Sequence, residues 1–193
     1  MQSTSNLVRS GGIAAALGGI LFTAKAYADR NDAPPWPTDA TDAFVFVIPL
    51  LFVIGVSGLY AVGRGRLGGL GTFGLLLSIV GFATGVVGSI GVRFVDGFWF
   101  VFVLGMLLGL VGLALAGIPV IRERLLGPWS FLPLILGLYG VFTLMTGDPA
   151  NSGFGRTIGL VLWVLFGLLW VTLGYALLSV RVHSRTSSRS ANA

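Results

Sequence analysis

Residues able to do acid–base or metal chemistry are few in this chain of 193 residues. Seven are acidic, one is histidine and none is cysteine. The lack of cysteine excludes disulfides, thiolate metal ligands and cysteine nucleophiles. The single histidine, His183, lies in a tail rich in serine and arginine, where a solvated side chain is expected. We therefore predict no catalytic, cofactor-binding or metal-ligating residue.

Aspartates supply the main group of oxygen ligands. They fall on one side of the predicted topology: Asp29, Asp32, Asp39, Asp42, Asp96 and Asp148. Carboxylates grouped in this way could gather cations or bind calcium. The spacing does not match an EF-hand loop, however, and the glycine that such a loop needs is missing. The preferred interpretation is a solvated acidic loop that helps to orient the chain.

A membrane enzyme is the weakest of three functional hypotheses. It would use loop residues such as Asp148 and Asn151 near Arg156. A catalytic site needs a nucleophile or a metal ion together with an oriented base, and the sequence supplies neither. We therefore expect that the protein is not an enzyme.

The segments that must position these residues are strongly apolar. The chain is 55% hydrophobic and 10% charged, with a mean hydropathy of +0.93. Soluble domains contain about 25% charged residues. Lipid accepts the apolar surface that a soluble protein of this length could not bury. The composition predicts an all-α, polytopic integral membrane protein that contacts the bilayer and binds no nucleic acid.

Six apolar segments are long enough, or nearly so, to cross a bilayer, which needs about 20 residues. They predict helices at about 10–28, 43–63, 67–92, 97–121, 125–147 and 157–180. These form a single domain over residues 1–180. Residues 181–193 are predicted to be a disordered, basic, cytoplasmic tail.

The distribution of arginine predicts the orientation. Alternate loops place eight basic residues on one side and four on the other. The side with eight contains Arg9, Arg64, Arg66, Arg122, Arg124, Arg181, Arg185 and Arg189. The positive-inside rule then places both termini in the cytoplasm of a cell-membrane protein.

The first helix has an alternative interpretation. Arg9, the apolar run 11–22 and Ala26-Tyr27-Ala28 resemble the three regions of a signal peptide. Against this, Lys25 is awkward so near a cleavage site. A weak repeat, with Arg-then-Gly openings near Arg9, Arg66 and Arg124, also requires this helix and predicts three tandem two-helix hairpins.

Small residues recur at four-residue spacing, which lets helix backbones approach closely. The pairs are Gly81/Gly85 and Gly105/Gly109, with Gly11, Ala15 and Gly19 in the first helix. Packing inside the bundle is the favoured interpretation. The alternative is a homo-oligomer or a membrane-protein partner bound through the Gly81/Gly85 and Gly105/Gly109 faces.

No Asp, Glu, His, Asn or Gln lies deep in any predicted helix. Proton-coupled carriers usually need such a titratable group. The leading hypothesis is therefore a structural or accessory subunit that packs through its glycine-rich faces. The alternative is a channel or carrier for a neutral or hydrophobic solute, for which breaks at Pro49 and Pro133 could free carbonyl groups to line a cavity.

Overall fold

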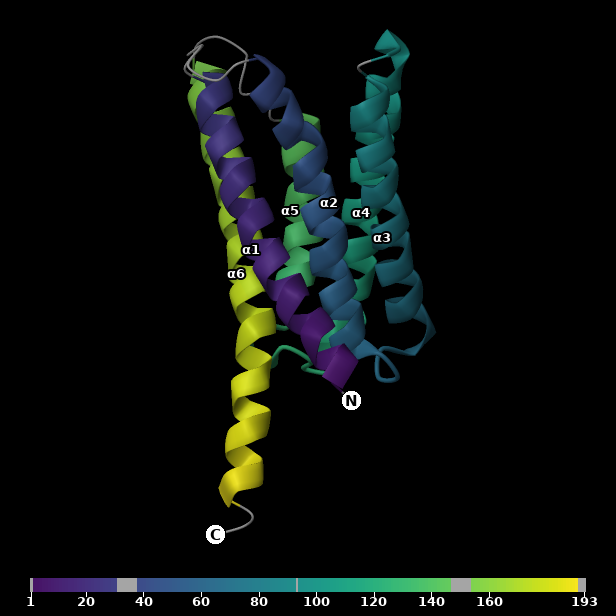
Figure 1. Ribbon diagram of the computed structural model, residues 1–193, viewed down its shortest axis with the longest axis vertical. Helices are drawn as coiled ribbons and strands as arrows, with labels where there is room; N and C mark the ends of the chain where they lie inside the picture. The colour runs from purple at the N-terminus through teal and green to yellow at the C-terminus, as the bar shows by residue number, and fades with distance from the viewer. Residues whose placement is uncertain (1, 31–37, 93, 147–153, 191–193) are drawn as a thin grey trace.

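The protein is a bundle of six α-helices in the computed structural model (Figure 1). The structure describes the backbone of residues 2–30, 38–92, 94–146 and 154–190, and the side chains of residues 6–28, 46–92, 94–95, 97–146 and 157–180. The elements are α1 Gln2–Arg30, α2 Thr38–Gly63, α3 Gly68–Gly91, the 3-10 turn η1 Asp96–Phe98, α4 Trp99–Arg122, the 3-10 turn η2 Gly127–Trp129, α5 Leu132–Thr146 and α6 Phe154–Ser190.

Consecutive helices pack against each other, and α1 also packs along α6. The six helices therefore close into a ring. The start of α1 and the end of α6 lie at the same end of the bundle (Figure 1). The turns at Arg64–Arg66 and Arg122–Arg124 connect helices at that end, which we call the basic end. The opposite end, where η1 lies, we call the far end.

The chain has six segments long and apolar enough to cross a membrane, one for each helix, and the fifth, Gly127–Thr146, begins in η2 before α5. The predicted all-α membrane bundle is confirmed, and the protein is an integral membrane protein. Five of the predicted helix starts lie close to or inside the observed helices. The start predicted at residue 125 differs: α5 begins at Leu132, although the apolar span that contains it begins at Gly127.

Local backbone chemistry explains the late start of α5. Gly127 has a positive φ, and Pro128 and Pro133 disfavour helical backbone in the residues before them. The 15 residues of α5 span about 22 Å, less than the hydrocarbon thickness of about 30 Å. The preceding segment, Leu125–Phe131, therefore has to fill the rest of that layer.

Helices α3 and α4 form the most extensive contact in the bundle, and glycine makes it possible. A Cβ atom built on Gly81 would lie 2.7 Å from the Cα atom of Gly109. One built on Gly105 would overlap the backbone of Gly85. All four glycines are buried. These glycines pack against each other and against the side chains of Phe82 and Met106 within the chain. None of the four is therefore exposed for the predicted partner interface.

The three predicted hairpins differ in their packing. Helices α1 and α2 meet at Gly11 and Gly58, whose Cα atoms leave no room for a side chain. The contact between α5 and α6 is much smaller than that between α1 and α6. Ala15 is fully buried in the first helix. Helix α1 therefore lies between α2 and α6, and its retention in the mature protein stays a prediction.

Helix α6 runs to Ser190, and Figure 1 shows its last part extending beyond the other helices. These residues coincide with most of the segment expected to be disordered. The expectation of a disordered tail stays a prediction, as does its cytoplasmic location.

Candidate functional site

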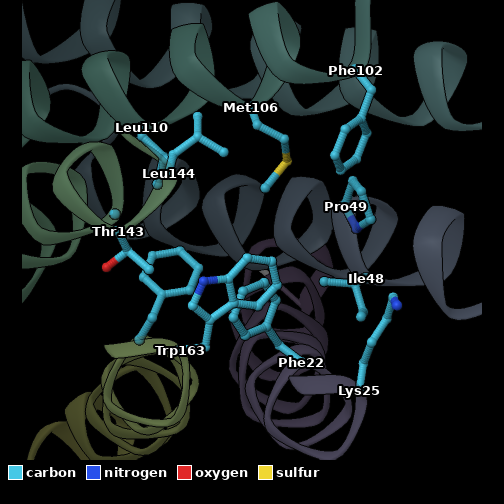
Figure 2. A pocket seen from close by; sticks show the side chains of 12 residues that line it. Phe22, Lys25, Ile48, Pro49, Phe102, Met106, Leu110, Thr143, Leu144 and Trp163 are labelled. Carbon is cyan, nitrogen blue, oxygen red and sulfur yellow. The ribbon is translucent and has the colours of Figure 1, made fainter. Parts of the chain in front are cut away.

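An apolar pocket of about 240 Å³ lies in the half of the bundle nearer the far end. Five helices contribute to it, and α3 alone does not (Figure 2). Its lining consists of Phe22, Lys25, Ile48, Pro49, Phe102, Met106, Leu110, Gly140, Thr143, Leu144, Trp163 and Phe166. The sequence did not predict this pocket, because its walls come from segments far apart in the chain.

Aromatic rings from α1 and α6 form one wall. Phe22 stacks on Trp163 with ring centroids 4.9 Å apart and meets Phe166 edge-to-face at 5.0 Å. Such offset-stacked and edge-to-face arrangements fix ring positions beyond the contribution of buried area. Met106 faces this wall from α4 (Figure 2). Its thioether chain adapts readily to an irregular space.

The pocket ends at a second group of rings, one turn nearer the basic end. Phe52 follows Ile48 and Pro49 on α2, and Trp170 follows Phe166 on α6. Phe52 and Trp170 stack with centroids 3.9 Å apart, and Phe82 meets both edge-to-face. All three side chains are fully buried. These rings fill the interior beside the pocket, so the pocket is not continuous with the basic end through this group.

One polar atom in that group lacks a hydrogen-bond partner. The indole N–H of Trp170 has no acceptor among the described residues. The rings of Phe52, Phe82 and Phe166 pack against the Trp170 ring that carries this N–H. Contacts of an N–H with an aromatic ring are weaker than bonds to oxygen, so this buried donor reduces the stability of the core.

Lys25 and Thr143 carry the polar side-chain groups of the pocket lining, apart from the indole N–H of Trp163. The hydroxyl group of Thr143 donates to the carbonyl oxygen of Tyr139 at 2.8 Å, within α5. Lys25 is half-buried and extends along one edge of the pocket beside Ile48 (Figure 2). The interior is otherwise hydrocarbon, aromatic ring and thioether.

Serine and threonine hydroxyl groups of the described helices donate within the protein and do not form a polar path. Most donate to backbone carbonyls within their own helix, as Ser57 does to Val53 at 2.7 Å. Ser78 differs, because it donates to the carbonyl oxygen of Gly109 at 2.7 Å and so joins α3 to α4. With their donors used in this way, these groups offer little to a polar solute.

The two prolines predicted to break helices behave differently. Pro49 lies inside α2, which continues past it without interruption, and it lines the pocket. Pro133 is the second residue of α5, where its missing N–H interrupts no helical bond. Pro133 does not line the pocket, so the cavity expected at this proline is not found there.

The side chains of the enzyme hypothesis are not among those that the structure describes. Asp148 and Asn151 are outside the described residues, and so is the side chain of Arg156. The acidic loop from Asp29 to Asp42 falls outside them in the same way, because none of its side chains is described.

No protein-family model, curated protein or solved structure matches this chain.

Proposed function

We propose that this protein is a membrane-embedded carrier that binds a small hydrophobic solute in the pocket between α1, α2, α4, α5 and α6. The supporting observation is an apolar space of about 240 Å³ that reaches into the bundle. Close-packed protein interiors contain few voids larger than a water molecule. A dry cavity of about 150 Å³ lined by Leu, Ile and Phe binds benzene, so this pocket suits a molecule of about ten heavy atoms or an alkyl segment of that size.

The chemistry of the lining supports a hydrophobic solute over a polar one. Ten of the twelve lining residues have no polar side-chain group, or only the indole N–H of Trp163. A solute with one polar end would place that end beside Lys25, at the edge of the pocket. A permanently open channel is disfavoured, since the stacked rings of Phe52 and Trp170 close the interior next to the pocket. Binding rather than catalysis is the proposed role.

The accessory-subunit hypothesis loses its main support. It depended on glycine-rich faces that a partner could cover, and Gly81, Gly85, Gly105 and Gly109 pack within the chain. An accessory role would have to use another surface.

The orientation predicted from the arginines would open the pocket in the outer half of the membrane.

The test is the intact mass of the protein extracted from its native membrane in mild detergent. Wild-type protein is expected to retain a small hydrophobic molecule at about one per chain. Leu144→Trp should lose it, because Leu144 lines the pocket and the larger ring would fill it. Met145→Trp is the matched control, since the neighbouring Met145 is 65% exposed and does not line the pocket. Ile48→Phe repeats the test from the opposite wall.

Two results would contradict the proposal. One is wild-type protein with no bound molecule. The other is equal retention by Leu144→Trp and Met145→Trp. A stoichiometric foreign subunit in the wild-type mass would instead support the accessory role.

A further inference from the structure

The turn after α4 places an arginine where helices usually place glycine. The amide of Arg124 donates to the carbonyl oxygen of Ile121 at 3.1 Å, and that of Leu125 donates to Val120 at 3.3 Å. These two bonds define a Schellman motif with Arg124 at the position after the C-cap. The φ angle of Arg124 is 47°, in the left-handed region. Glycine is the usual residue there, because a Cβ atom is disfavoured.

Among the described residues, Arg124 is the one residue other than glycine with a positive φ angle. The other positive φ angles belong to Gly65, Gly68 and Gly127. The chain contains 30 glycines, so glycine is common in its composition. An arginine at a position that suits glycine indicates a role for its side chain.

A surface depression lies beside this arginine. It is lined by Ile121, Arg124, Gly127, Pro128, Ser130 and Phe131. The hydroxyl group of Ser130 is already used, since it donates to Gly127 and accepts from the amide of Leu126. The guanidinium group of Arg124 is therefore the charged group available to a ligand in this depression.

A second basic turn lies next to the first. The guanidinium group of Arg66 donates to the carbonyl oxygen of Glu123 at 3.3 Å, which joins the turn between α2 and α3 to the residue before Arg124. Arg122 ends α4 at the same place. Arg66, Arg122 and Arg124 are all exposed. Planar guanidinium groups match the paired oxygens of a phosphate.

The depression also lies at the edge of the hydrocarbon layer. The apolar span that contains α5 begins at Gly127, so the depression joins the charged turn that ends at Arg124 to the start of that span. An exposed apolar stripe leads away from the depression along α5: Phe131, Ile135 and Leu138. Their spacing of four and three residues places them on one face of the helix. A ligand with both a phosphate and an acyl chain fits this combination better than a soluble phosphate.

We propose that the depression beside Arg124 binds the phosphate of an anionic phospholipid headgroup, with an acyl chain along Phe131 and Ile135. The site is separate from the far-end pocket and does not depend on its function. Arg124 contacts a phosphate oxygen, and Arg66 adds positive charge from the neighbouring turn.

The test compares the melting temperature of the full chain in phosphatidylcholine vesicles and in vesicles that also contain phosphatidylglycerol. Wild-type protein is expected to melt higher with phosphatidylglycerol. Arg124→Gly should lose at least half of that increase. In pure phosphatidylcholine it should be as stable as wild type or more so, since glycine relieves the left-handed backbone. Arg124→Gln removes the charge while retaining a side chain.

Arg9→Gln is the matched control, because it removes one exposed charge at the same end of the bundle and should retain the increase. Equal losses in Arg9→Gln and Arg124→Gln would overturn the proposal in favour of general charge attraction. Retention of the full increase by both Arg124 variants would also overturn it. An equal increase with inorganic phosphate in phosphatidylcholine would identify a soluble phosphate as the ligand and overturn the lipid assignment.

Discussion

Gly81 and Gly85 have equivalent places in the sequence pattern of small residues, but the structure predicts opposite effects for their replacement by alanine. A Cβ atom at position 81 would meet the backbone of α4, 2.7 Å from the Cα atom of Gly109. A Cβ atom at position 85 would have Met106 Sδ as its nearest neighbour, at 3.5 Å. The first contact is with backbone that cannot rotate away, and the second is an ordinary van der Waals contact with a flexible side chain.

The magnitudes follow from these distances. Ordinary contact begins near 3.4 Å, so Gly81→Ala would push α3 and α4 apart by roughly 0.7 Å or more. Overpacking of this kind costs about 1–3 kcal/mol. Alanine is favoured over glycine inside a helix by about 1 kcal/mol. Gly81→Ala should therefore lower the free energy of unfolding by up to about 2 kcal/mol, and Gly85→Ala should raise it by up to about 1 kcal/mol.

The assay is reversible denaturation of each variant in the same detergent micelles, followed by circular dichroism, with the oligomeric state measured in parallel. A loss of stability in Gly81→Ala but not in Gly85→Ala is the expected result. Equal effects of the two substitutions would refute the reasoning from the packing of α3 on α4. A change of oligomeric state without a change of stability would show that these glycines form an interface between chains.

Three further predictions concern the core and use the same denaturation assay. Phe52→Ala should lower the free energy of unfolding by about 3 kcal/mol, because Phe52 is fully buried and stacks on Trp170; a loss under about 1 kcal/mol would contradict this packing. Trp170→Phe should leave the free energy of unfolding within about 1 kcal/mol of wild type, since the lost contacts are offset by removal of an N–H that lacks an acceptor among the described residues. A loss above about 3 kcal/mol would indicate a partner for that N–H. Ser78→Ala should lower the free energy of unfolding by about 0.5–2 kcal/mol, because it removes a hydrogen bond to Gly109 on another helix. Ser57→Ala removes a hydrogen bond within α2 and should lower it less, so equal losses would refute this distinction.

The sequence predicted the membrane location and most of the helix boundaries, because lipid imposes a simple rule. A segment that crosses the hydrocarbon must be apolar, about 20 residues long and helical. The failure at α5 shows the limit of that rule. Leu125 and Leu126 are apolar and buried, yet they precede the helix. Hydropathy detects that a residue avoids water, but the backbone conformation there is set by Arg124, Gly127 and Pro128.

The candidate sites depended on tertiary structure. Phe22, Met106 and Trp163 belong to three helices and show no shared motif in the sequence, so only the closed ring of helices reveals that they line one pocket. The pairs Gly81/Gly85 and Gly105/Gly109 were recognisable as close-packing positions, but spacing along one helix cannot identify the surface that meets it. The sequence by itself determined the solvent of this protein, because apolar composition and length fix the partition into lipid. Which apolar faces meet each other, and which space they leave, was decided by side-chain shape across helices.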